Sequence, residues 1–387
     1  MKTPTAGSRR SLGGVFMLAG VAVLLQSWPN RLLADGVFPG TTWATKTPED
    51  LGMNSAGLAA FKNRVGGSGV VIKDGYLVYS WGAYTQSHDW FSASKPVVST
   101  MLFFAINEGK VAGVDSRIAD WGWALKPNDQ TMTFRHLADM TSGYMRSENP
   151  GQKWAYNDYA INLYIRTMAK VFGVSGTNLS SPGKSRLATP LHFQDGGVFN
   201  SAGRVIASPR DFARIGLFWM NKGNWNGTQL LPTSFFDNYM KADVPANTAR
   251  TSGTDPNGDY LNVGSYGGGS DQASIGPGVY GFNWWFNKNK DTSTLTWPAA
   301  PADTFQANGR WGTEAVTMFP SLGMVVAAYN ENGGWGSFTT GSAGSGMNQS
   351  LKLLVDACPE PASLALLAVA GLPLLARRRN RTPTTRR

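Results

Sequence analysis

The order of apolar and polar positions separates two β-rich ends of the chain from a helical middle. The runs 69–73 and 76–81 are rich in β-forming residues and flank Asp74-Gly75, a pattern that predicts a β-hairpin. An apolar run that follows Ser92 predicts a helix ending near Gly109. Toward the other end, β-rich segments predict three more strands, over 280–286, 313–319 and 324–330.

The segments between these strands have helical patterns. Helices are predicted over 58–64, 131–141, 159–171, from Ser208 onward, and over 351–357 with a few residues before it. Residues 248–278 are rich in Gly, Ser, Asn and Asp, which predicts a long loop or lid. We therefore expect a mixed α/β fold of the α+β type. An antiparallel sheet (about 58–95 and 279–357) would be flanked by helices, with a mainly helical lobe (about 96–278) inserted.

The first residues have the composition of an export signal. Lys2, Arg9 and Arg10 form a basic start, 15–25 an apolar core, and Ala34 a cleavage point. The apolar run is too short to favour a transmembrane anchor. We expect residues 1–34 to be removed by a signal peptidase, so that the domain at 35–357 works outside the cytoplasm.

The last residues, 358–387, have the features of a second targeting signal. Pro359-Glu360-Pro361 leads into an apolar stretch at 362–376, and four of the next five residues are arginine. This order resembles the Pro-Glu-Pro C-terminal sorting signal of bacterial exosortase substrates. The resemblance implies a short transmembrane segment, transient membrane association, cleavage by an exosortase and transfer to the cell envelope or the medium.

The net charge of +10 comes entirely from the two ends. Residues 1–34 hold four basic side chains and residues 377–387 hold six, with no acidic ones. The body between them is neutral, so nothing predicts a nucleic-acid partner. The lone cysteine, Cys358, cannot form an internal disulfide and is interpreted as part of a linker. The three histidines are scattered and form no metal-ligand pair, so no metal and no cofactor are expected.

Ser92-Ala93-Ser94-Lys95 is the strongest candidate for catalytic chemistry. One helical turn places Ser92 and Lys95 on the same face, where a desolvated lysine with a lowered pKa can take the serine proton. The S-x-x-K pattern is a signature of serine acyl-enzyme chemistry. Ser181 and Lys184 have the same spacing, but their Pro-Gly centre predicts a turn and no apolar helix follows.

Two further segments could complete such a site. Tyr156 lies between a Pro-Gly loop and a helix, and beside a cationic Lys95 it could have a lowered pKa and act as a base, although on this segment alone packing at the helix start is the better explanation. Gly309 precedes the strand at 313–319, where a backbone N–H could join that of Ser92 in an oxyanion hole. A plain β-turn explains this second segment as well.

Six blocks in order resemble the β-lactamase-related serine hydrolases, which include class C β-lactamases, penicillin-binding-protein-like enzymes and family VIII carboxylesterases. The blocks are the hairpin at 69–82, the motif at 91–96, the segment 133–143, Tyr156-Asn157-Asp158, the helix at 208–216 and Ala307-Asn308-Gly309. The resemblance spans about 48–356 and implies a β-lactamase/DD-peptidase-like fold.

The resemblance also implies roles for individual residues. Ser92 would be the nucleophile, Lys95 would handle its proton, and Tyr156 would act as a base or hydrogen-bond partner. Substrate would meet Asp158 and the segment 307–310, with the N–H groups of Ser92 and Arg310 as the oxyanion hole. Asp158 stands where relatives have asparagine, and Ala307 replaces the basic residue that binds a substrate carboxylate. Both departures argue against β-lactams and favour small, neutral esters or amides.

Two other functions remain compatible with the sequence. A catalytically idle surface domain of the same fold could bind cell-wall or matrix material. A Ser-His-Asp hydrolase ranks lower, because the chain has no G-x-S-x-G elbow and His88, His136 and His192 have no triad context.

Overall fold

The computed structural model of this chain describes residues 36–272, 275–337 and 346–358. The predicted export signal and the sorting signal from Pro359 onward lie outside these residues, so both stay predictions. Within the described ranges, no helix combines the length and apolarity needed to span a bilayer.

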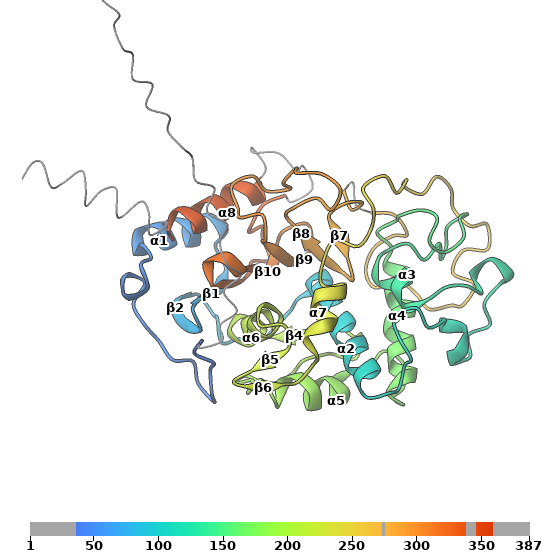
Figure 1. Ribbon diagram of the computed structural model, residues 1–387, viewed down its shortest axis with the longest axis horizontal. Coiled ribbons are helices and arrows are strands. Elements are labelled where there is room, and N and C mark those ends of the chain that lie inside the picture. The colour runs from blue at the N-terminus through green and yellow to red at the C-terminus, as the bar shows by residue number, and fades with distance from the viewer. Residues whose placement is uncertain (1–35, 273–274, 338–345, 359–387) are drawn as a thin grey trace, which may run out of the picture.

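A seven-stranded antiparallel sheet forms the centre of the fold (Figure 1). Its strand order is β2-β1-β11-β10-β9-β8-β7. The strands are β1 (Ser68–Lys73), β2 (Tyr76–Trp81), β7 (Tyr280–Gly281), β8 (Trp284–Phe286), β9 (Phe305–Gly309), β10 (Glu314–Phe319) and β11 (Met324–Tyr329). This arrangement confirms the predicted fold class and the joining of strands from opposite ends of the chain.

The predicted hairpin is present and is the first unit of the sheet. Asp74 and Gly75 connect β1 to β2 with φ angles of 49° and 85°, the left-handed conformation that such a two-residue turn requires. On its other side β1 pairs with β11, from Ser68 opposite Tyr329 to Lys73 opposite Met324.

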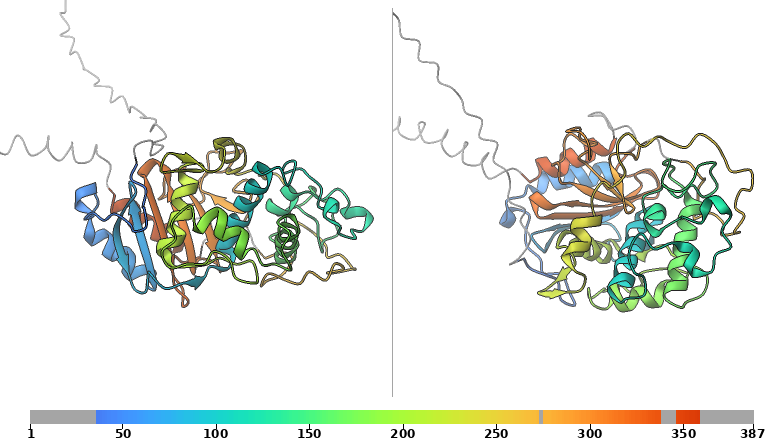
Figure 2. Two further views of the ribbon diagram at one scale, coloured as in Figure 1. Left: turned by 90° about the horizontal axis from the view of Figure 1, so that it is seen from below. Right: turned by 45° about the vertical axis from the view of Figure 1, so that its right-hand side comes forward.

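Helices cover both faces of the sheet (Figure 2). On one face α1 (Ser55–Val65) packs beside α8 (Gly346–Asp356), and the Asn54 N–H donates to the carbonyl of Ala357. On the other face α6 (Pro209–Met220) lies so close that a Cβ on Gly216 would come within 2.9 Å of Val316 and Val325. The helix that begins after Ser208 therefore packs directly on the sheet, although the sequence analysis assigned it to the inserted lobe.

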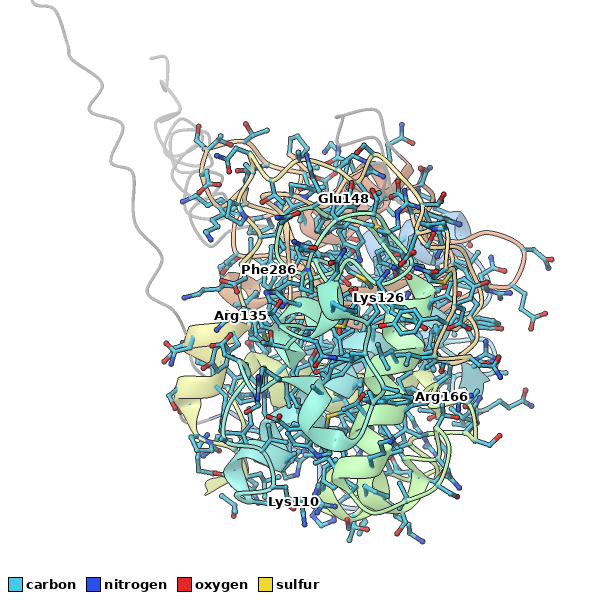
Figure 3. The ribbon with its side chains drawn as sticks, turned by 90° about the vertical axis from the view of Figure 1, so that its right-hand side faces the viewer. Lys110, Lys126, Arg135, Glu148, Arg166 and Phe286 are labelled. Atoms are coloured by element: carbon cyan, nitrogen blue, oxygen red, sulfur yellow. The ribbon has the colours of Figure 1, made fainter. Side chains whose placement is uncertain are left out.

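The remaining helices build the other side of the molecule. They are α2 (Lys95–Asn107), α3 (Phe134–Ala138), α4 (Asp158–Val171), α5 (Ser180–Gly183) and α7 (Thr233–Tyr239). Figure 3 shows this side, with Arg135 of α3 and Arg166 of α4 on it. The described residues also form two small sheets. One pairs β3 (His88–Asp89) with β4 (Ile206–Ala207), and the other pairs β5 (Asn224–Trp225) with β6 (Thr228–Gln229).

Several local predictions were wrong. The single strand predicted over 280–286 is two short strands, because Phe282 and Asn283 have positive φ and turn the chain. Strand β9 was not predicted as a strand, and of the two interpretations left open for this segment, a strand edge and a plain turn, the structure shows the strand. The Pro-Gly centre of 181–184 lies in α5, which continues as a π-helix to Ala188. Cys358 is not in a loose linker: it is 9% exposed and joins the hydrophobic core.

Candidate active site

Ser92 lies in a tight turn that leads into α2. Residues Phe91–Ser94 form one turn of 3-10 helix, and Phe91 has a φ of 39°, which is costly for a non-glycine residue. Hydrogen bonds around the turn stabilise this conformation. The Phe91 N–H donates to Asp89 at 3.0 Å, and the indole N–H of the fully buried Trp90 donates to the Ala207 carbonyl at 2.8 Å.

Lys95 begins α2 and is almost completely buried, with 1% of its side chain exposed. Its Nζ atom donates to Ser92 Oγ at 2.8 Å, to Tyr156 OH at 2.6 Å and to Asp158 Oδ1 at 2.7 Å. A lysine ammonium has three N–H donors, so these three contacts use all of them. The structure thus brings together the three predicted catalytic residues and Asp158.

Two opposing effects act on the pKa of Lys95. Burial lowers this pKa because the charged form loses its hydration, and the negative charge of Asp158 raises it. The rings of Tyr156 and Tyr266, at 4.0 and 5.3 Å from Nζ, also favour the ammonium form. Burial is the larger effect, so the site favours neutral Lys95 more than water does.

Tyr156 is held at the start of α4. The Asn157 side chain caps this helix by accepting from the N–H groups of Tyr159 and Ala160. Burial raises the pKa of Tyr156, and the charge of Asp158 acts in the same direction. The lowered pKa considered from the sequence is therefore wrong, and Tyr156 is better suited to pass a proton than to remove one as a tyrosinate.

The predicted substrate segment 307–310 lies at the end of β9. Strand β8 pairs only with Phe305 and Gln306, so it leaves the edge of β9 open from Ala307 to Gly309. Ala307 is fully buried and does not line the pocket described below. Asn308, Gly309 and Arg310 do line the pocket, and the Asn308 amide donates to the Gln306 side chain at 3.0 Å.

Gly309 lies directly against the turn that carries the nucleophile. A Cβ at this position would be 3.0 Å from the backbone nitrogen of Ala93 and 2.3 Å from Glu314 Oε1. Only glycine fits this approach, which brings the end of β9 beside Ser92. The signal for it in the sequence was the glycine at a strand edge.

Arg310 follows with a φ of 37°. Its guanidinium lies over the Phe91 ring at 4.1 Å, and its Nε atom is 3.6 Å from the carboxylate of Glu314. Glu314 is fully buried, and burial raises its pKa to about 7. It also accepts a hydrogen bond from Thr313. Sequence analysis missed Glu314, because a carboxylate at the start of a strand is usually exposed.

The loop at 248–278 enters the site through Tyr266, which sequence analysis also missed. The Tyr266 hydroxyl donates to the carbonyl of Phe91 at 2.9 Å, and its N–H donates to the carbonyl of Asp158 at 3.1 Å. Tyr266 therefore ties the loop both to the turn before Ser92 and to the start of α4. Its surroundings in sequence are Gly and Ser, which predict a loop but no contact.

A pocket of about 420 Å³ opens above Ser92. Its walls include Tyr156, Asp158, Tyr266 and Arg310, and the others are Phe91, Gly267, Gln272, Trp285, Asn308, Gly309, Trp311, Thr313 and Glu331. This volume suits a small-molecule ligand. The pocket can therefore present a substrate carbonyl to Ser92.

The structure offers little support for the competing chemistries. The His88 ring lies 3.3 Å from Ser68 Oγ, and the His136 ring accepts from the Thr133 N–H, so these two have partners other than Ser92. Ser181 and Lys184 are exposed. Within the described residues, no group of three or more His, Cys, Asp or Glu side chains is placed to hold a metal ion.

Comparison with known proteins bears on the fold. Residues 56–195 match the Beta-lactamase family model. The chain has the fold of β-lactamases and penicillin-binding proteins. A search of curated protein sequences found no match.

Solved structures resemble this one over most of its length. A penicillin-binding protein homolog from Caulobacter crescentus aligns with a TM-score of 0.53 and 11% identity, covering 82% of this chain and 99% of the other. A beta-lactamase from Mycobacterium bovis gives 0.52 and 15%, covering 78% and 100%. EstCE1, a hydrolase with promiscuous acyltransferase activity, gives 0.50 and 13%, covering 79% and 97%. At these identities the likeness concerns the fold.

Proposed function

We propose that this protein is a serine hydrolase that cleaves small esters or amides through an acyl-enzyme on Ser92. The observation that carries the proposal is the position of the Lys95 ammonium, within 2.8 Å of Ser92, Tyr156 and Asp158 in a buried site. A cation that is only structural would need one carboxylate partner. Contacts to a serine and a tyrosine at the floor of a pocket are the arrangement that proton transfer requires.

The reaction follows from these contacts. Ser92 Oγ attacks the substrate carbonyl carbon while neutral Lys95 takes the hydroxyl proton. The negative charge that develops on the carbonyl oxygen is stabilised by the N–H groups of Ser92 and Arg310. The bond to the leaving group then breaks, and the leaving oxygen or nitrogen takes a proton from Lys95 through Tyr156. Water attacks the acyl-enzyme in the same way, which releases the acid and returns the proton to Ser92.

Lys95 must lose one proton before it can accept another. In the ammonium form all three of its N–H groups donate hydrogen bonds, one of them to the Asp158 carboxylate at 2.7 Å. Burial lowers the Lys95 pKa and raises the Tyr156 pKa, so neutral lysine is the base that the electrostatics favour.

The proposal includes export and surface sorting, which rest on the composition of the two ends. The sequence at 1–34 would direct secretion, and the Pro-Glu-Pro tail would hold the protein at the membrane until an exosortase cleaves it. β-Lactams are expected to be poor substrates, because Asp158 lines the pocket and adds a negative charge that would repel their carboxylate.

Labelling with a fluorophosphonate, together with hydrolysis of p-nitrophenyl acetate, tests the activity. The wild-type chain should be labelled and active. Ser92→Ala should abolish both and keep the fold, with a loss of several orders of magnitude in rate. Ser181→Ala, which changes the exposed serine of the second S-x-x-K, is the matched control and should retain both. A correctly folded wild-type protein that neither labels nor turns over would instead support the idle binding domain.

A further inference from the structure

The walls of the pocket are unusually rich in aromatic side chains. Five of its fourteen lining residues are aromatic: Phe91, Tyr156, Tyr266, Trp285 and Trp311. Four of them are largely shielded from solvent, whereas Trp311 is 47% exposed. Aromatic rings give a pocket large apolar surface and a preference for flat partners.

Two of these rings form a continuous wall beside the nucleophile. Trp285 of β8 pairs with Gln306, the last residue of β9 that β8 contacts before the edge of β9 becomes open. Its ring is stacked on Tyr156, with centroids 5.9 Å apart and planes inclined by 26°. Tyr280 braces the same indole edge-on at 4.6 Å. The wall is therefore fixed before any ligand arrives.

The charged side chains of the pocket differ in how they are paired. Asp158 is paired with Lys95 at 2.7 Å, and Glu331 accepts from the Tyr329 hydroxyl at 3.0 Å. The Arg310 guanidinium lies on Phe91, close to Glu314, and its buried Nε and Nη2 atoms form no hydrogen bond with the described residues. These charges exclude no class of substrate, so the aromatic side chains are the selective feature of the pocket.

We propose that the pocket selects esters that carry an aromatic group, which packs against the wall formed by Tyr156 and Trp285. This inference rests on the proposed hydrolase function and adds a substrate class to it. An aromatic group gains ring–ring contact in addition to apolar burial, whereas a saturated ring of the same size gains burial alone.

A pair of matched substrates tests the selection. Benzyl acetate and cyclohexylmethyl acetate have the same acyl group, similar leaving alcohols and nearly equal size, so the ratio of their kcat/KM values isolates the effect of aromaticity. We expect the wild-type protein to prefer benzyl acetate by about 2- to 10-fold, the range that one aromatic pair supplies.

Variants assign the preference to the wall. Trp285→Leu should bring the ratio close to one, and any general loss of rate cancels in that ratio. Trp123→Leu, which changes a half-buried indole bonded to Thr167 outside the pocket, should leave the ratio unchanged. If Trp285→Leu does not fold, the inhibition constants of benzylboronic and cyclohexylmethylboronic acid on the wild-type protein provide the comparison, since boronic acids add reversibly to a nucleophilic serine.

The possible results distinguish a failure of the aromatic selection from a failure of the proposed hydrolase function. A wild-type ratio of one or less, or an unchanged ratio in a folded Trp285→Leu, would overturn the aromatic selection while Ser92 labelling stands. Equal inhibition by the two boronic acids would do the same. Absence of Ser92 labelling would overturn the hydrolase proposal itself.

Discussion

Replacing Asp158 by asparagine should shift the pH dependence of the reaction toward acid. The carboxylate lies 2.7 Å from Lys95 Nζ, and its charge raises the pKa of that lysine. Asparagine keeps the size and the acceptor oxygen but removes the charge. The pKa of Lys95 should then fall, so Lys95 becomes neutral, and able to act as a base, at a lower pH.

The size of the change follows from the short distance and the burial of both groups. At 2.7 Å, with an effective dielectric constant of about 20, two unit charges attract by roughly 6 kcal/mol. The side chains are 1% and 7% exposed, so solvent screens this attraction little, but their desolvation offsets much of it. An opposite charge this near typically moves an apparent pKa by about 1 to 3. The acid limb of kcat/KM should move along the pH axis by an amount in that range.

The assay is a pH profile of kcat/KM with an uncharged ester, read from the released alcohol so that the signal does not depend on pH. If the limb moves by about one pH unit, Asp158→Asn should be about 10-fold faster than wild type at any pH below both limbs. Asp303→Asn is the matched control, since it changes a half-buried carboxylate that bonds Ser321 and does not line the pocket. Its profile should equal that of the wild type.

Circular dichroism across the same pH range separates a catalytic effect from unfolding, because loss of a buried partner also destabilises the fold. An acid limb that stays in place, or that moves to higher pH in a folded Asp158→Asn, would refute the assignment of Lys95 as the base. Such a result would mean that another group controls the limb.

Two more variants probe the surroundings of the nucleophile. Tyr266→Phe removes the donor to the Phe91 carbonyl and should lower kcat and the labelling rate by about 10-fold with little change in KM, whereas Tyr260→Phe, in the same loop but bonded to Asp129, should change neither. Gly309→Ala places a methyl group 3.0 Å from the nucleophile turn, and calorimetry should show a destabilisation of about 1–3 kcal/mol together with reduced turnover.

Local patterns in the sequence were enough to predict the elements with strong periodicity or turn chemistry. The hairpin at Asp74-Gly75 and the helix after Ser92 agree with the structure to within a few residues. Strand β9, Phe-Gln-Ala-Asn-Gly, alternates apolar and polar residues but is short and has no β-branched residue, and it pairs with β10 along its whole length. Its extended form therefore depends on a tertiary contact that the segment itself does not reveal.

At the site, the sequence identified the residues but did not predict which of them contact one another. Asp158 was expected to meet the substrate, and the structure places its carboxylate on Lys95. The pKa of Tyr156 depends on burial by distant elements, which local sequence patterns do not reveal. Tyr266 and Trp285 come from segments more than a hundred residues away from Ser92, so only the folded chain brings them to it.

The pairing of β1 with β11 has a consequence for how the chain matures. The last strand of the sheet fits between β1 and β10, so the β1–β2 hairpin has no sheet to join until residues 324–329 have been made. Such distant pairing slows folding and leaves the early strands without partners. If the chain is exported unfolded, this delay would keep it competent for translocation, and the site at Ser92 would be assembled only after the last strand has crossed the membrane.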